Sequence, residues 1–363
     1  MMDKESKFPF YAKITLILFG IFLFFAILYI GQEIIAPLAF AIIISIVLHP
    51  VVKFFVRRKI NRLVAIIITL FLTIIVIAAF CVLLFSQASR FSESWPVLVD
   101  KFTKALNQSI IWTSGYLDIS PVKITEWLAK AKGELVNIDS SVIGKTLVAF
   151  GSWFFVAFLI PVYIFLILFY QPILLAFIHR LFDKGKQSQV GEIITQIKNV
   201  IQHYLVGLVI EFFIVSTLDA VALLVLGIDY AILIGVIGGL LNVIPYIGGV
   251  VAVAIPMMIA LATKSTAWYA LYVLAAYYFI QLIDNNIIVP KIVASKVKIN
   301  ALFSIIVVLV GGTLWGITGM FLSIPLLAIV KLIFDHIEPL KPWGFLLGDT
   351  MPSLLRSSRS KKT

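Results

Sequence analysis

The sequence contains few charged residues for its length. Charged side chains make up 13% of the 363 residues, and hydrophobic residues make up 61%. A soluble domain is about a quarter charged. A water-soluble fold has too little interior to bury this much apolar surface. The chain is therefore predicted to cross a lipid bilayer several times, as an all-α protein.

The sequence also lacks the residues that several function classes require. Its one cysteine, Cys81, lies in an apolar run, so the chain can form neither an internal disulfide bond nor a cysteine-based metal site. His49 and His203 lie near the ends of apolar runs, where interfacial anchoring is a better explanation than metal ligation. No phosphate loop, His-Glu-x-x-His or Gly-x-Ser-x-Gly motif occurs. We therefore expect no enzyme activity, no cofactor, no bound metal and no built-in ATPase.

Acidic residues are scarce in the short loops, and basic residues are common there. The net charge is +11, and the stretch from Lys53 to Arg62 holds five basic residues and no acid. This is the positive-inside pattern, so it explains the charge without a nucleic-acid partner. It predicts a multi-pass protein of the cytoplasmic (inner) cell membrane with both termini in the cytoplasm.

Six apolar runs are suited to crossing the bilayer as single helices. Between the third and the fourth run, residues 86–146 form a nearly neutral segment with helical spacing of apolar residues, predicted to be an external amphipathic helix on the membrane or on a neighbouring subunit. A second amphipathic helix is predicted at Val190–Tyr204, on the cytoplasmic side. The six runs are Ile14–Ile30, Ile34–Val52, Leu63–Phe85, Thr146–Tyr170, Tyr204–Leu226 and Ala267–Val289.

Two further apolar segments, Tyr230–Ala262 and Ala301–Val330, are interrupted by glycine and proline. A straight helix does not tolerate this pattern, so each is predicted to be a broken, re-entrant hairpin. The first is entered from outside and the second from the cytoplasm, an arrangement typical of secondary transporters. Alternatively, the small residues only let helices pack closely. The residues assigned to the hairpin backbone, together with Pro290, are Pro245, Gly248, Gly249, Gly311, Gly312, Gly316 and Pro325.

A polar cluster interrupts the apolar run at Gln281–Pro290. Asp284 is the first candidate for a carboxylate that binds substrate or a coupling ion, because intramembrane acids are costly and rare without a function. The equally supported alternative is an Asp–Asn cap at a helix end. Amide side chains that suit a polar substrate, and two further intramembrane acids, complete the candidate site: Asn285, Asn286, Gln281, Asn242, Glu211 and Asp219.

The predicted organisation has about eight transmembrane helices, including the two hairpins, plus the external segment. N-terminal helices occupy residues 1–85 and the external segment residues 86–146. A transmembrane helix and the cytoplasmic amphipathic helix occupy residues 147–202. A transport core follows at residues 203–334, and a cytoplasmic tail at residues 335–363.

Three motifs resemble the autoinducer-2 exporter family, the PerM-like permeases. They are Ile244-Pro-Tyr-Ile-Gly248, Asp284-Asn-Asn-Ile-Ile-Val-Pro-Lys-Ile292, and Gly311-Gly312 followed by Gly316-Ile-Thr-Gly319 and Pro325. The chain departs from the family pattern at Val293–Ser295, where a glycine is usual, and at Ile299–Ala301, where a Leu-His-Pro-type step is usual. The resemblance implies a multi-pass, homo-oligomeric transporter, either an exporter of a small signalling molecule or a sodium (lithium)/proton antiporter.

The sequence thus favours an ion-coupled secondary transporter that exports a small polar solute of the autoinducer-2 type, with a proton or sodium as the coupling ion. A sodium (lithium)/proton antiporter is the first alternative. The second is a non-transporting scaffold or channel-like protein in which the motifs serve only packing.

Overall fold

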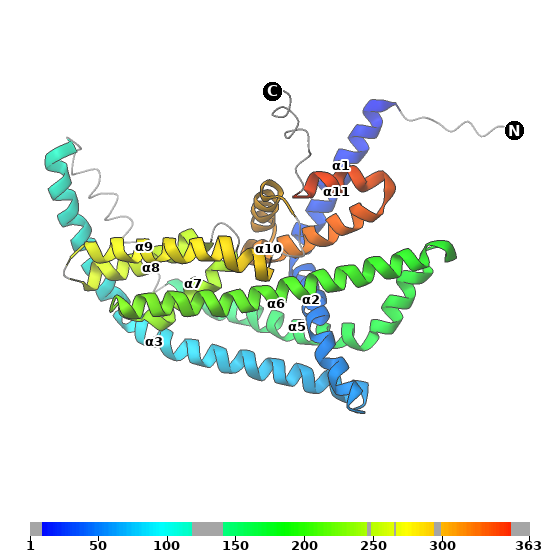
Figure 1. The fold of residues 1–363 in the computed structure, drawn as a ribbon, viewed down its shortest axis with the longest axis horizontal. Helices are drawn as coiled ribbons and strands as arrows, with labels where there is room; N and C mark the ends of the chain where they lie inside the picture. Colours follow the sequence, from blue (N-terminus) through cyan, green and yellow to red (C-terminus); the bar gives the residue numbers. More distant parts are fainter. Residues whose placement is uncertain (1–8, 118–140, 245–247, 265, 294–298, 350–363) are drawn as a thin grey trace, which may run out of the picture.

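The computed structural model describes residues 9–117, 141–244, 248–264, 266–293 and 299–349. Within them, regular structure is helical apart from one isolated β-bridge between Ile299 and Gly348 (Figure 1). Seven of the described helices are long and apolar enough to cross a membrane, and two shorter apolar helices accompany them. The predicted all-α polytopic membrane fold is confirmed.

The long helices occupy most of the described chain (Figure 1). Short 3-10 turns at Lys184–Lys186 and Glu338–Leu340 lie between them, and a π-helix at Asp284–Val293 follows α9 directly. The α-helices are α1 (Phe10–Ile30), α2 (Gln32–Arg57), α3 (Arg62–Leu117), α5 (Ser141–Arg180), α6 (Gln187–Val225), α7 (Ala231–Asn242), α8 (Gly248–Thr263), α9 (Trp268–Ile283), α10 (Ala301–His336) and α11 (Lys341–Leu347).

The first helices expose a largely apolar surface. Helix α1 has no buried residue, and aliphatic and aromatic side chains along it and along α3 are exposed. In water this surface would be strongly unfavourable, whereas in a bilayer it is the expected contact with lipid.

All four of the predicted segment boundaries fall inside helices, at residues 85/86, 146/147, 202/203 and 334/335. Helix α3 runs through residues 85 and 86, and α6 joins the predicted amphipathic helix to the next predicted span without a break. Residues 118–140 of the predicted external segment lie outside the described residues. Helical periodicity does not change where a helix leaves the bilayer, so the sequence pattern alone did not reveal this continuity.

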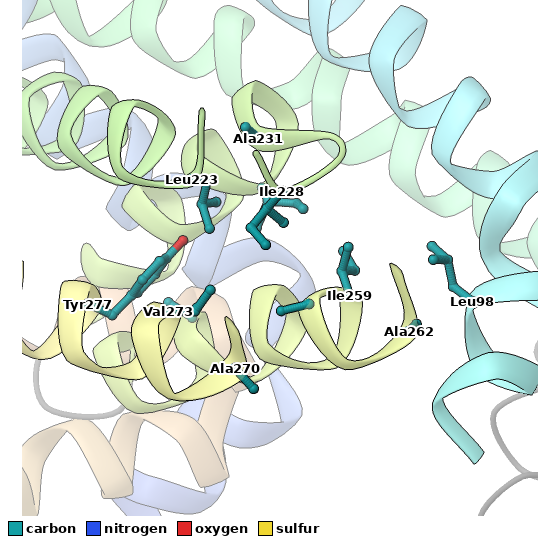
Figure 2. Close-up of a cluster of buried hydrophobic side chains, with 12 residues drawn as sticks. Leu98, Leu223, Ile228, Ala231, Ile259, Ala262, Ala270, Val273 and Tyr277 are labelled. Carbon is teal, nitrogen blue, oxygen red and sulfur yellow. The ribbon is translucent and has the colours of Figure 1, made fainter. Parts of the chain in front are cut away.

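The far end of α3 packs on this chain. Leu98 and Val99 are buried, and Leu98 belongs to an apolar cluster with Ile259 and Ala262 of α8 (Figure 2). Phe91 adds an edge-to-face contact with Tyr230, just before α7. The apolar face of residues 91–102 therefore packs on α8 of the same chain, while the extracytoplasmic position of residues 86–146 stays a prediction.

The first interrupted segment is a hairpin of α7 and α8, which contact each other. Glycines on α7 allow close approach to α6: a Cβ at Gly239 would lie 2.9 Å from the backbone nitrogen of Ser216 and 3.0 Å from the carbonyl oxygen of Phe212. Gly248 and Gly249 begin α8, and Pro245 lies outside the described residues. The predicted break is confirmed, and its position puts Asn242 at the end of α7.

The second interrupted segment is also a hairpin, within α10. Non-helical backbone angles at Trp315 and Gly316 divide it into two arms. The arms pack so closely that a Cβ at Gly311 would collide with the backbone of Gly319, and the reverse also holds. Ser323 Oγ lies 2.9 Å from Val307 O on the opposite arm, within reach as a donor. The glycines are therefore required by the contact between the arms.

A substitution at Gly316 tests the backbone conformation of the turn separately from the packing between the two arms of α10. The φ of Gly316 is 60° and its ψ is −142°, and nothing lies within 4 Å of a Cβ placed there. This region of backbone angles is almost exclusive to glycine, so Gly316→Ala should destabilise the protein by about 1–3 kcal/mol without any steric clash. The midpoint of thermal unfolding in detergent measures the loss. An unchanged midpoint would show that the turn tolerates a side chain.

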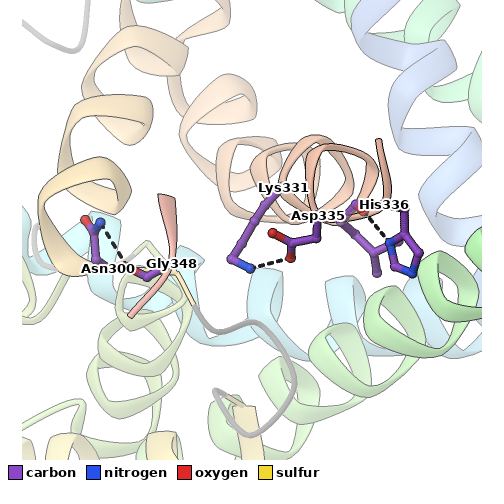
Figure 3. A network of polar contacts seen from close by, with 6 residues as sticks. Asn300, Lys331, Asp335, His336 and Gly348 are labelled. Atoms are coloured by element: carbon purple, nitrogen blue, oxygen red, sulfur yellow. Dashed lines mark hydrogen bonds and ion pairs between the residues drawn. The ribbon is translucent and has the colours of Figure 1, made fainter. Parts of the chain in front are cut away.

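The two ends of the α10 hairpin are joined near the C-terminus (Figure 3). Asn300 caps α10 by accepting from Phe303 N at 3.0 Å, and its amide donates to Leu346 O at 2.8 Å and to Gly348 O at 3.2 Å. Beyond the second arm, α11 packs back on α10, with Gly344 against Asp335. One side chain thus connects the start of the hairpin to the segment after its end.

Replacing Asn300 with alanine should open this junction. The substitution removes the helix cap and two hydrogen bonds to carbonyl groups, so we expect a loss of about 2–3 kcal/mol. Asn199→Ala, at an exposed helical asparagine, is the matched control and should cost far less. Thermal unfolding of both variants measures the difference, and equal midpoints would contradict the assigned role.

Candidate functional site

Asp284 lies at the point where α9 becomes a π-helix, and its side chain is 2% exposed. Asn242 Nδ2 donates to Asp284 Oδ2 at 2.9 Å, and Gln281 Nε2 lies 3.5 Å from the same oxygen. Both donors are side chains, not backbone N–H groups of a helix end. This environment differs from the helix cap that was the alternative interpretation of the Asp–Asn pair.

Asn242 connects two acids from different helices. Its Nδ2 also donates to Glu211 Oε1 of α6, at 3.3 Å. The break after α7 makes this geometry available, because Asn242 is the last residue of the helix. The tip of the first hairpin therefore places a neutral amide between the carboxyl groups of Glu211 and Asp284.

Positive charge is not supplied to this site by the protein. Among the described residues, none of the buried acids Glu211, Asp219 and Asp284 forms an ion pair. Asp284 Oδ1 is buried and has no hydrogen-bond partner among the same residues. Buried carboxyl groups without a basic partner are costly unless a proton or another cation neutralises them. The site is therefore chemically suited to binding a cation, a proton or a hydrogen-bond donor.

A cleft of about 670 Å³ opens onto this cluster. Its size falls within the range of small-molecule sites, and its wall is mainly apolar with a few polar groups. It lies between α6, the first hairpin, α9 with its π-helix, and the second hairpin. Residues that represent these elements in the lining are Glu211, Asn242, Gly249, Gln281, Asp284, Asn285, Ser304 and Ile324.

Asp219 lies in a separate, smaller chamber of about 10 Å³, the space of a single water molecule. Tyr277 lines it too, and Tyr277 OH has no hydrogen-bond partner among the described residues. Asp219 Oδ2 lies 2.6 Å, and Tyr277 OH 3.6 Å, from the position of a Cβ on Gly238. Four residues line both the chamber and the cleft, so the two spaces adjoin: Asn242, Gly249, Tyr277 and Gln281.

Not all of the predicted site residues lie at the cleft. Asn286 donates to Leu282 O of its own helix at 2.8 Å and does not line the cleft. Pro290 is exposed in the π-helix, where its missing N–H interrupts α-helical bonding. Gly311, Gly312, Gly316 and Pro325 build the second hairpin without lining the cleft. Asp219 is 2% exposed and is therefore buried within the protein, separately from Asp284 and Glu211, which line the cleft.

Sequence reasoning missed Tyr277 and Ser304. Tyr277 lies four residues before Gln281 and seven before Asp284, which is the spacing of one helical face and could have indicated it. Ser304 lines the cleft only because the second hairpin packs beside α6. No local pattern in the sequence points to that contact.

This fold and cleft define a polytopic α-helical membrane transporter, in which two broken hairpins meet at an internal polar site. Residues 17–338 match the model of the AI-2E family transporter, and the chain belongs to this family. The resemblance noted in the sequence is thereby confirmed.

Several curated proteins are similar to the chain over most of its length. The AI-2 transport protein TqsA of Escherichia coli (strain K12) is 26% identical over 88% of this chain and 90% of its own length. The proposed transport protein YrrI of Bacillus subtilis (strain 168) is 24% identical over 84% of this chain and 87% of its own length. The proposed permease PerM of Escherichia coli (strain K12) is 26% identical over 85% of this chain and 89% of its own length.

Proposed function

We propose that this transporter exports a small polar solute of the autoinducer-2 type and couples the export to movement of a proton or sodium ion. The observation that carries the proposal is the unpaired, buried Asp284 at the wall of a cleft between two hairpins. The name of TqsA supplies the solute class.

The cleft supports solute binding in a specific way. Asn242, Gln281 and Asn285 present both donors and acceptors, and an unpaired oxygen of Asp284 accepts. Tyr277, Tyr278 and Leu274 add apolar surface beside them. A small molecule with several hydroxyl groups can form hydrogen bonds with these side chains in place of those it forms with water.

Ion coupling follows from charge. When a proton or sodium neutralises Asp284 or Glu211, the electrostatic cost of the empty site falls, and the hydrogen bond from Asn242 to that acid weakens. Hairpin movement and solute release would then depend on the bound ion. We further propose that the basic α2–α3 turn faces the cytoplasm and that copies of the chain associate in the inner membrane.

The three buried acids also favour a second candidate, a sodium (lithium)/proton antiporter, because cation exchange needs carboxyl groups and no solute. Purified protein in proteoliposomes separates the candidates. Autoinducer-2 flux that rises at least tenfold under an imposed proton or sodium gradient supports export. Sodium-for-proton exchange without any effect of autoinducer-2 supports the antiporter. If neither flux is measured and the protein still assembles stably, the result supports a non-transporting scaffold.

A further inference from the structure

Three cationic residues and a histidine, from three helices, gather near the end of the bundle that carries the α2–α3 turn. Gln202, one turn after Lys198, donates to Ile46 O, one turn before His49, so Lys198 and the His49–Lys53 stretch lie at the same level of the bundle. His49 is within electrostatic reach of Lys53, Arg62 and Lys198. His49 and Lys53 belong to α2, Arg62 begins α3, and Lys198 belongs to α6. Residues distant in the sequence thus form one cluster (the basic cluster). In Figure 1, α2 crosses α5 and α6, and it contacts both helices.

In the part of the chain that the structure describes, no acidic side chain pairs with the basic cluster. Arg62 donates to Leu168 O at 2.8 Å and to Gln171 Oε1 at 3.4 Å, both neutral acceptors. Like charges held this close repel, and the repulsion is stronger where water is partly excluded. An anion bound among them would remove that cost.

The cluster differs from the loop charges that set membrane orientation. Arg57, Arg58 and Lys59 are exposed at the turn, as the positive-inside pattern requires. His49, Arg62 and Lys198 are instead half-buried on helices. Orientation alone does not require basic residues from three helices to converge in a partly buried position.

The surroundings of the cluster match a lipid headgroup region. An apolar cluster that includes Val52, Ala65 and Leu168 adjoins it, since Val52 precedes Lys53 in the chain and Arg62 donates to Leu168 O. Val51, Phe54 and Leu174 are exposed beside it and offer apolar surface to acyl chains. Basic side chains at the boundary between apolar surface and water are placed where headgroup phosphates lie.

We propose that Lys53, Arg62 and Lys198, with His49 beside them, bind the headgroup phosphate of an anionic phospholipid at the junction of α2, α3 and α6. The bound lipid neutralises the cluster and holds α6 against α2. The hydrogen bond from Gln202 to Ile46 O, at 2.6 Å, already joins these two helices one turn from His49. The inference does not depend on which solute or ion is transported.

The test uses purified full-length protein in detergent with added phosphatidylglycerol, phosphatidylcholine or inorganic phosphate. Phosphatidylglycerol should raise the midpoint of thermal unfolding and remain bound in native mass spectrometry, and phosphatidylcholine should do neither. The double variant Lys53→Gln/Lys198→Gln should bind phosphatidylglycerol about 25-fold more weakly, because each basic residue near an anionic lipid contributes about fivefold. Arg62 is left intact because its bonds also support the fold.

Two matched variants make the result decisive. Lys184→Gln/Lys186→Gln removes the same charge from exposed positions and should bind like the unmodified protein. Lys53→Arg/Lys198→Arg keeps the charge and should retain binding, and it remains informative if the glutamine variant fails to fold. Equal weakening in both glutamine variants would overturn the proposal, as would equal binding of phosphatidylcholine. If inorganic phosphate stabilises the protein as much as phosphatidylglycerol does, the site binds free phosphate and the proposal of a lipid ligand is wrong.

Discussion

Replacing Asp284 with asparagine is expected to reduce gradient-driven flux about 10- to 100-fold while leaving the fold intact. Asparagine has nearly the same shape and still offers an acceptor to Asn242, so the contact between α7 and α9 survives. It cannot bind a proton or pair with a cation. The hydrogen bonds of a charged group contribute roughly 1.5–3 kcal/mol, which corresponds to the stated range.

The measurement is the initial rate of autoinducer-2 flux in proteoliposomes, with and without an imposed proton or sodium gradient. Asp183→Asn is the matched control, since Asp183 is exposed before a 3-10 turn, and it should transport at the full rate. Thermal unfolding and size-exclusion profiles show whether each variant is folded. Full gradient-driven flux by a well-folded Asp284→Asn protein would exclude the assigned role of this carboxyl group.

The Gly319→Val substitution should have the largest effect on stability. A Cβ at this position would collide with the carbonyl group of Gly311 and lie 3.0 Å from the Cβ of Trp315. The obstacle is backbone on the opposite arm, so no side-chain rotation relieves it. Inserting atoms into a tight contact costs about 1–3 kcal/mol and occasionally more, and we expect roughly 3 kcal/mol or more here.

Gly20→Val is the control for this experiment. Nothing lies within 4 Å of a Cβ at Gly20 on the exposed helix α1, so the same change there should be close to neutral. Fluorescence-detected size exclusion and thermal unfolding compare the two variants. If Gly319→Val matches Gly20→Val in stability, the two arms of α10 do not pack as closely as the structure indicates.

Strong local patterns explain the predictions that succeeded. Two long apolar runs carry glycines and prolines that a straight helix does not tolerate, so both breaks could be located from sequence. Gly316 was among the residues assigned to the second hairpin, and it forms the turn because it adopts a positive φ. Asp284 stood out because a carboxyl group in an apolar run is rare.

Other features depended on contacts that no local pattern records. Asn285 and Asn286 are adjacent and chemically identical, yet only Asn285 lines the cleft. The apolar face of residues 91–102 could have met lipid, another subunit or this chain, and only the fold selects α8. The π-helix after α9 turns Asp284 toward Asn242, and the sequence around Pro290 indicated a break without its geometry.

By itself, the sequence determined that this protein is helical, crosses the membrane several times and carries two interrupted segments with Asp284 between them. Hydrophobicity, helix-breaking residues and charge bias act locally, and each can be interpreted one residue at a time. Only the tertiary structure decided that Asn242 connects Glu211 with Asp284, that Asp219 lies in its own chamber, and that basic residues of three helices meet. The physical reason is that helices are placed by side-chain packing over long sequence distances, which a one-dimensional pattern does not encode.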